Sequence, residues 1–323
     1  MTPPVIAVSC GEPSGIGPEL VESAWAALRG ALPFVWIGDP AHLPGTVPYH
    51  LVTDAADAAR VAESALPVLP QVFDGPRVPG TPQPAQTKGV IAAIETGVAL
   101  CQSGAVAGLC TMPIHKAALQ SGADFAYPGH TEFLSALAGD APVAMMLASD
   151  LLRVVPATIH IALQDVPAAL DAQAIRQAVV TLDAGLRRYF GLERPRIAVA
   201  GLNPHAGEGG RMGREEIDLI IPTLDALRAE GYTLSGPHSA DTLFHAAART
   251  RYDAVVAMYH DQALIPIKTL AFDEGVNVTL GLPFVRTSPD HGTALDIAGQ
   301  GLADASSTIA ALRMARQMAD AAT

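Results

Sequence analysis

Short runs of apolar residues alternate along this chain with longer segments of helical periodicity. The apolar runs are rich in Val, Ile, Leu and Ala, and each predicts a buried strand. They cover residues 5–8, 34–37, 106–109, 143–147, 154–159, 197–200, 254–258 and 276–280. Amphipathic helical patterns lie between several of them, at residues 172–190, 215–230 and 306–321. The alternation predicts an α/β fold, with buried parallel strands covered by helices.

The length of the chain favours two domains. It has 323 residues, which is more than one average domain needs. Pro and Gly cluster in residues 75–84, which indicates an excursion on the surface, but no Ser/Gly-rich linker divides the chain. A discontinuous arrangement of domains is therefore compatible with the sequence.

The charge of the chain disfavours nucleic acid as a partner. The formal net charge is −12, whereas nucleic-acid-binding proteins present a basic field. A phosphorylated ligand would have to be held by a few local cations and by backbone N–H groups.

Cysteine spacing and hydropathy indicate the compartment. Cys10, Cys101 and Cys110 form an odd set without C-x-x-C spacing, which predicts neither a disulfide framework nor a zinc knuckle, and favours a reducing cytoplasm. Polar residues interrupt the longest apolar stretch, residues 141–163, and the N-terminus lacks a basic region. We therefore expect no signal peptide and no membrane span.

A glycine-rich segment, GEPSGIGPE at residues 11–19, follows the first predicted strand and opens a helix near Pro18. Such a loop can hold an anion, but its spacing matches neither the dinucleotide fingerprint nor the P-loop. A structural turn that lines a cleft is an equally good interpretation.

Three histidines each follow an apolar strand: His160, His205 and His260. The carboxyl ends of parallel strands share one edge of the sheet, where ligands bind. Three imidazoles there could hold one transition-metal ion and leave coordination positions for a substrate. The alternative is that each is an ordinary buried histidine.

Candidate anion-binding residues are Lys268, Asn277 and Arg286. Lys268 and Arg286 are embedded in apolar runs, IPIK and PFVR, where a charge needs a partner. Lysine offers a point charge and arginine a bidentate fork.

Two further segments carry polar groups. His130 and Thr131 could hydrogen-bond a substrate ahead of a helix, although Thr131 could equally be a helix N-cap. Asp241 could accept a proton or orient a ligand, with an N-cap role as the alternative.

Seven sequence blocks together resemble the 4-hydroxythreonine-4-phosphate dehydrogenase family of pyridoxal phosphate biosynthesis. In order they are GEPSGIGPE at 11–19, MPIHK at 112–116, PGHTEF at 128–133, NPHAGE at 203–208, ADTLF at 240–244, MYHDQ at 258–262 and RTSPDHGTALDIAG at 286–299. They extend over nearly the whole chain.

The resemblance implies two α/β/α domains related to isocitrate and isopropylmalate dehydrogenases. It places a nucleotide-binding domain at residues 1–130 plus 280–323, and a metal- and substrate-binding domain at 131–279. It also implies a homodimer whose active sites are shared between subunits, with one metal ligand from the partner.

The resemblance also implies roles for individual residues. The metal ligands would be His160, His205 and His260. Substrate contacts would be His130, Thr131, Lys268, Asn277 and Arg286, with His130, Asp241 and Lys268 as the catalytic candidates. The segment with His291, Gly292, Asp296 and Gly299 would contact the adenosine part of the cofactor.

The implied reaction is oxidation of 4-phosphohydroxy-L-threonine at C3 by NAD or NADP, followed by decarboxylation. Zinc is the first choice of metal, with cobalt, nickel, iron or magnesium as alternatives. Residues 161–163 and 237–239 depart from the family pattern, which leaves phosphothreonate or phosphoerythronate as alternative substrates. A non-catalytic phosphometabolite-binding protein of the same fold, or a hydrolase with a histidine-bound metal, is the alternative from another class.

Overall fold

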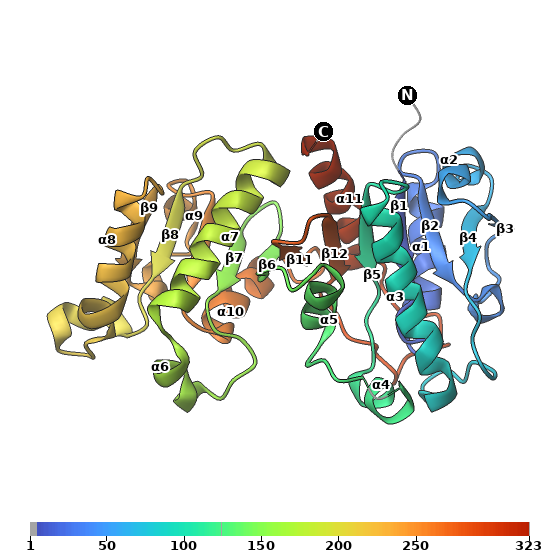
Figure 1. Ribbon diagram of the computed structural model, residues 1–323, viewed down its shortest axis with the longest axis horizontal. Helices are drawn as coiled ribbons and strands as arrows, with labels where there is room; N and C mark the ends of the chain where they lie inside the picture. Colours follow the sequence, from blue (N-terminus) through green and yellow to red (C-terminus); the bar gives the residue numbers. More distant parts are fainter. Residues whose placement is uncertain (1–4, 124, 323) are drawn as a thin grey trace. The chain divides into compact units, whose positions relative to one another are not determined.

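The computed structural model describes residues 5–123 and 125–322, and these form two compact units. The first comprises the described residues within Met1–Ala141 and Leu282–Ala321, and the second lies within Pro142–Gly281. Each unit has a sheet covered by helices (Figure 1). The predicted α/β fold class is confirmed.

The sheet of the first unit is parallel. Its strands follow the order β3-β4-β2-β1-β5-β12, and each neighbouring pair runs in the same direction. The strands are β1 (Ile6–Ser9), β2 (Phe34–Gly38), β3 (Tyr49–Leu51), β4 (Leu66–Pro70), β5 (Gly108–Thr111) and β12 (Val285–Pro289). All residues of β1, β2, β5 and β12 are buried, as a sheet covered on both faces requires.

Helices cover both faces of this sheet. On one face, Gly97 of α3 lies against Leu109 of β5. On the other, the Thr287 hydroxyl of β12 donates a hydrogen bond to the Ala311 carbonyl of α11, and α11 also contacts α1. The helices of this unit are α1 (Gly17–Leu28), α2 (Ala58–Val61), α3 (Thr87–Gln102), α4 (Lys116–Ala123), α5 (His130–Leu137) and α11 (Ser306–Ala321).

The sheet of the second unit is mixed. Its order is β11-β6-β7-β10-β8-β9, in which β6 is antiparallel to both neighbours and the pairs from β7 onward are parallel. The strands are β6 (Ala144–Ala148), β7 (Arg153–Pro156), β8 (Ile197–Ala200), β9 (Leu234–His238), β10 (Ala254–Ala257) and β11 (Val276–Leu280). The expectation of parallel strands is therefore wrong for β6. A short connection, closed by a hydrogen bond from the Ser149 N–H to the Leu152 carbonyl, joins β6 to β7 and requires an antiparallel pair.

Two long helices cover opposite faces of this second sheet. Gly185 of α7 lies against Leu280, whereas Ala263 and Ile267 of α10 join the core beside Val154. The helices are α6 (Val166–Ala169), α7 (Ala172–Phe190), α8 (Ile221–Ala229), α9 (Ala246–Arg249) and α10 (His260–Leu270).

The helix expected over residues 215–230 is divided in two. A π-helical turn over Glu216–Ile220 precedes α8, which has a proline, Pro222, in its first turn. Proline has no N–H to give to the preceding turn, so a regular α-helix cannot pass through this point with all of its bonds. Among the described residues, no helix is long and apolar enough to cross a membrane.

Candidate active site

Three adjacent strands of the second unit carry the three histidines at one edge of the sheet. His160 lies four residues after the end of β7, and His205 lies five residues after the end of β8. His260 lies three residues after the end of β10 and is the first residue of α10. Strand β10 lies between β7 and β8, and all three are parallel. The rings of His160 and His260 have centroids 5.7 Å apart.

Two of these histidines have left-handed backbones. The φ angle is +53° at His160 and +51° at His205, and every residue from 205 to 209 has a positive φ. Non-glycine residues in this conformation cost on the order of 1 kcal/mol or more each, and such strain is concentrated at functional sites. The surrounding structure must therefore hold the turn at His205 in place.

Glu216 stabilises that turn through hydrogen bonds. Its side chain is buried, with 1% of its surface exposed, and it accepts hydrogen bonds from the Asn203 backbone N–H at 2.8 Å and from the Asn203 side-chain amide at 3.0 Å. A Cβ atom on Gly207 would lie 2.6 Å from the Glu216 carboxylate, so only glycine fits there. No pattern in the sequence pointed to Asn203 or Glu216.

A chain of hydrogen bonds connects the three strand ends. The Thr158 hydroxyl, after β7, donates to the Met258 carbonyl, after β10, at 2.8 Å. The Met258 N–H donates to the Gln262 side-chain oxygen at 2.7 Å, and the Gln262 amide donates to the Gly201 carbonyl, after β8, at 2.8 Å. Gln262 thereby fixes the relative positions of the segments that carry the histidines.

Replacing Gln262 with leucine should destabilise the protein by about 2–4 kcal/mol, because it leaves a buried N–H and a buried carbonyl without partners. The measurement is the free energy of unfolding in urea. Gln177→Leu is the matched control, since that glutamine makes one bond, to the Val143 carbonyl, and connects none of the three histidine segments. Equal effects of the two changes would contradict the bridging role.

A cavity of about 240 Å³ opens beside two of the histidines. Its lining includes His160, His260, Asp261, Tyr259 and Thr158. The Nδ1 atom of His260 lies 2.7 Å from the Asp261 carboxylate. This is the arrangement in which a carboxylate orients a metal-binding imidazole and leaves its Nε2 atom for the metal.

The described residues of one chain contain no group of three or more His, Cys, Asp or Glu side chains that could hold a metal ion. His160 and His260 are close enough for their rings to be in contact, but His205 does not complete a set with them. Imidazole donors suit a transition metal, so the chemistry of the donors fits and their number within one chain does not.

Two other predicted residues of the second unit, Lys268 and Asn277, lie on the side of the sheet that α10 covers, away from the edge with the histidines. Lys268 lies on α10, eight residues after His260, and is half-buried, with its Nζ atom 5.7 Å from the centroid of the Phe272 ring. Asn277 of β11 is paired with Leu147, on the face that α10 covers. Its side-chain oxygen is buried and has no hydrogen-bond partner among the described residues.

Asp241 is exposed in a short turn after β9, Ala240–Thr242. A hydrogen bond from the Ser239 hydroxyl, together with the charge of His205, lowers the pKa of the Asp241 carboxyl. Asp241 is therefore an ionised carboxylate near His205. The N-cap interpretation is wrong, because Ser239 occupies the cap position.

In the first unit, the buried Arg286 lies close enough to His130 for its charge to affect the imidazole. Arg286 of β12 is 2% exposed and donates a hydrogen bond to the Thr111 hydroxyl at 2.7 Å, and burial lowers the pKa of its guanidinium to about 10. Burial and the charge of Arg286 hold the pKa of His130 well below its usual range. The His130 Nε2 atom is buried and has no hydrogen-bond partner within the described residues.

His130 and Thr131 occupy the first turn of α5. Gly129 is the N-cap residue, and no side chain caps this helix. The N-cap interpretation of Thr131 is therefore wrong, and its hydroxyl is in the first helical turn beside His130.

The predicted cofactor-binding residues lie along one segment between β12 and α11. The Nδ1 atom of His291 is 2.9 Å from the Gly292 carbonyl, and its Nε2 atom is buried without a partner in the described part of the chain. Space beside Gly292 is open, since a Cβ there would meet no atom within 4 Å. Asp296 and Gly299 are exposed.

The structure thus assigns the candidate residues to two groups. His130, Thr131, Arg286 and the 291–299 segment belong to the first unit, and the three histidines, Asp241, Lys268 and Asn277 belong to the second. The buried polar atoms without a partner among the described residues include His130 Nε2, Asn277 Oδ1 and His291 Nε2, which belong to predicted ligand-binding residues. Buried polar groups are nearly always hydrogen-bonded, so these atoms are candidates for contact with a ligand.

Known proteins resemble this chain over its whole length. A 4-hydroxythreonine-4-phosphate dehydrogenase of Ruegeria sp. (strain TM1040) is 63% identical, covering 98% of this chain and 97% of the relative. The relative of that name from Caulobacter vibrioides is 52% identical, over 99% and 98%.

Solved structures give the same result. The crystal structure of 4-hydroxythreonine-4-phosphate dehydrogenase from Klebsiella pneumoniae is 38% identical, with a TM-score of 0.88 over 98% of this chain and 99% of that one. Isocitrate dehydrogenase from Methylococcus capsulatus, 14% identical with a TM-score of 0.50 over 98% of this chain and 87% of that one, shares the fold. Residues 31–315 match the family described as pyridoxal phosphate biosynthetic protein PdxA. The chain therefore belongs to the PdxA family.

Proposed function

We propose that this chain is a dehydrogenase that oxidises 4-phosphohydroxy-L-threonine at C3 with NAD or NADP and then releases carbon dioxide, leaving 3-amino-2-oxopropyl phosphate. The observation that carries this proposal is the set of buried, unpaired polar atoms on His130, Asn277 and His291. A substrate and a dinucleotide would supply the missing hydrogen bonds. The names of the full-length relatives support the same reaction.

The chain has the cations that a phosphorylated amino acid requires. Arg286 can bind a phosphate or carboxylate with two parallel N–H bonds, and Lys268 can add a point charge. The net charge of −12 makes these local cations necessary, because the overall field repels an anion. Thr131 and Asn277 would add neutral hydrogen bonds that orient the substrate.

We assign the metal site to His160, His205 and His260, and the adenosine site to the segment with His291, Gly292, Asp296 and Gly299. A bound divalent metal would polarise the C3 oxygen, and the nicotinamide would accept the hydride. Imidazole ligands favour zinc or another transition metal over magnesium.

Protons would be handled by His130 or Asp241. His130 is neutral at physiological pH because its pKa is depressed, so one ring nitrogen can accept the C3 hydroxyl proton as the hydride leaves. Asp241 is ionised and can accept a proton or orient the substrate amine. When the bond from C2 to the carboxylate breaks, its electrons pass to the carbon skeleton, which then takes up a proton. Lys268, the third catalytic candidate, would be able to donate that proton.

The depressed pKa of His130 predicts a pH dependence of stability. The unfolded chain binds a proton at this residue below pH ~6.5, whereas the folded protein does not, so stability is lost as the pH falls from that value toward the folded pKa. We expect the Tm to fall more steeply between about pH 7 and 5 in the native protein than in His130→Gln. His50→Gln, a change at an exposed histidine, is the control. Identical slopes in all three proteins would rule the effect out.

We also propose a homodimer in which a partner subunit completes the metal site. The described residues of one chain supply no complete set of donors, which supports this arrangement. If His205 and His260 serve the same site from different subunits, a mixture of His205→Ala and His260→Ala proteins should regain activity. At random exchange about half of the dimers are hybrids, each with one intact site, so activity should reach about a quarter of the native value.

Mass spectrometry of the intact dimers would verify subunit exchange in that experiment. A mixture of His205→Ala with a second, separately tagged His205→Ala protein is the control and should stay inactive. Inactivity of the hybrid would argue that each site is built within one chain.

The three cysteines fit a cytoplasmic protein of this kind. They are free, and burial raises the pKa of Cys101 to about 12 and that of Cys110 to about 11. Such thiols are poor nucleophiles and poor metal ligands, so we assign them no part in the reaction.

The experiment that tests this function is a panel of phosphorylated hydroxy acids, each incubated with the metal-loaded protein and NAD or NADP. We expect NADH or NADPH and carbon dioxide in equal amounts from 4-phosphohydroxy-L-threonine. Faster turnover of phosphothreonate or phosphoerythronate would reassign the substrate. Dinucleotide binding without turnover of any member would favour a binding protein, and phosphate release without reduction would favour a hydrolase.

A further inference from the structure

Two segments far apart in the sequence meet in the first unit: the glycine-rich loop at residues 11–17 and the predicted cofactor-binding segment. The Ile16 N–H donates a hydrogen bond to the Thr293 carbonyl at 3.1 Å. A Cβ on Gly15 would lie 2.7 Å from the same carbonyl, so glycine is needed for this close approach. The loop therefore supports the 291–301 segment.

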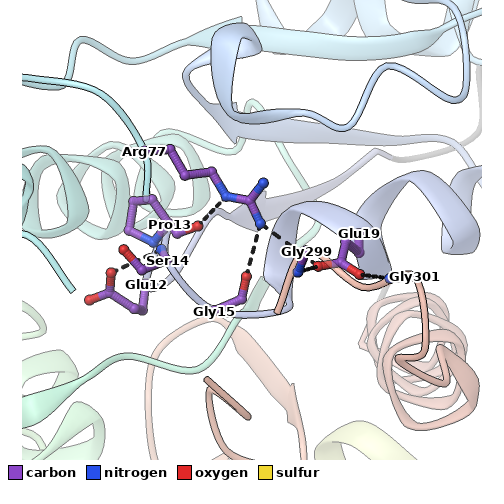
Figure 2. Close-up of polar contacts among 8 residues, drawn as sticks. All are labelled: Glu12, Pro13, Ser14, Gly15, Glu19, Arg77, Gly299 and Gly301. Atoms are coloured by element: carbon purple, nitrogen blue, oxygen red, sulfur yellow. Dashed lines mark hydrogen bonds and ion pairs between the residues drawn. The ribbon is translucent and has the colours of Figure 1, made fainter. Parts of the chain in front are cut away.

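Glu19, in the first turn of α1, holds the far end of that segment (Figure 2). Its carboxylate accepts hydrogen bonds from two backbone N–H groups, those of Gly299 and, at 3.0 Å, Gly301. Both glycines have positive φ angles, +79° and +68°. The carboxylate thus holds the two glycines of a left-handed turn in place.

Arg77 connects the loop to Glu19. Its Nε atom donates to the Pro13 carbonyl at 2.6 Å and its Nη2 atom to the Gly15 carbonyl at 3.3 Å, while Nη2 lies 3.8 Å from the Glu19 carboxylate (Figure 2). The two side chains are 12% and 10% exposed, so water screens this ion pair little. Arg77 comes from the Pro- and Gly-rich stretch at 75–84, whose Gly80 N–H also donates to the Ser14 carbonyl.

We infer that Glu19 and Arg77 are positioning residues for the dinucleotide: they preorganise the 291–301 segment against the glycine-rich loop before the cofactor binds. This inference rests on the proposed function. Neither side chain needs to touch the cofactor, because both act through backbone groups of the segment. A segment that is ordered in advance loses less conformational entropy on binding.

The test is the affinity for NAD alone, measured by calorimetry on the full chain. Glu19→Gln keeps the shape of the side chain but opposes one N–H with another, and Arg77→Met removes the fork. We expect each to raise the Kd for NAD about tenfold, with kcat at saturating NAD and the KM of the phosphorylated substrate within about twofold of the native values. Arg77→Lys should give a smaller rise, since lysine can make only part of the contacts.

The matched control is Arg60→Met, which breaks an exposed ion pair with Asp57 in the same unit and should leave the Kd unchanged. If Arg77→Met does not fold, Glu19→Gln and Arg77→Lys decide the matter. An unchanged Kd in Glu19→Gln and Arg77→Lys, or an equal loss of NAD and substrate binding, would overturn the inference while the native protein still reduces NAD. A native protein that binds no NAD would overturn the proposed function as well.

Discussion

Replacing His205 with alanine is expected to reduce turnover by about a thousandfold or more while the protein stays folded, because a metal that polarises the reacting oxygen contributes several kcal/mol to the transition state. His205 lies five residues after β8, in a left-handed turn that Glu216 holds in place. Loss of the imidazole would remove one proposed metal ligand but none of the hydrogen bonds of that turn. The measurements are kcat and the metal content of the purified protein.

A second substitution at this position separates the loss of the imidazole from any change in the backbone conformation. Asparagine adopts the left-handed region readily, so His205→Asn should fold as the native protein does and still lose turnover. His245→Ala, which changes an exposed histidine of the same unit, is the matched control and should keep full activity. Normal turnover with a full complement of metal in His205→Ala would show that this histidine is not a ligand.

Changing Arg286 to lysine is expected to raise the KM for the phosphorylated substrate by about ten- to a hundredfold, since a point charge cannot replace two parallel hydrogen bonds to an anion. Lysine also lacks the fork with which Arg286 reaches the Thr111 hydroxyl. The measurement is a steady-state titration of the substrate at saturating cofactor. Unaltered kinetics would remove Arg286 from the anion site.

Thr111→Val distinguishes the two roles of this arginine. It removes one hydrogen-bond partner of Arg286 but leaves the guanidinium, so we expect a change in KM several times smaller than in Arg286→Lys. Arg60→Lys, at an exposed position, is the control for the substitution itself. A larger effect of Thr111→Val than of Arg286→Lys would mean that Arg286 mainly supports the sheet.

Sequence patterns alone anticipated the placement of the three histidines for a simple physical reason. Each histidine follows an apolar run, and parallel strands align their carboxyl ends, so His160, His205 and His260 had to come near one edge if β7, β8 and β10 were neighbours. The residues that hold this edge were not anticipated. Gln262 and Glu216 carry no local signal beyond a polar side chain, and their importance comes from burial and from partners far along the chain.

The same limit applies to the cofactor segment. The sequence indicated that the glycine-rich loop and the 291–299 segment both matter, the latter only through a family resemblance. In the sequence, Glu19 is one charge at the end of the glycine-rich segment and Arg77 one charge within the Pro- and Gly-rich stretch at 75–84. Glu19 bonds to Gly299, 280 residues away, and Arg77 bonds to Pro13, 64 residues away. The periodicities of strands and helices, two and 3.6 residues, carry no information about partners at such separations.

Local hydrophobic pattern determined the class of fold, and for β8 and β11 even the bounds, because an apolar run between turns has few alternatives to a buried strand. Tertiary contacts decided the rest. Strand β12 has the half-polar sequence VRTSP and is nevertheless fully buried, since Arg286 and Thr287 find partners on β5 and α11. The direction of β6 and the edge that carries the three histidines likewise depend on which strands become neighbours. The local sequence determines which segments are buried, whereas the neighbours of each segment are determined only when distant parts of the chain meet.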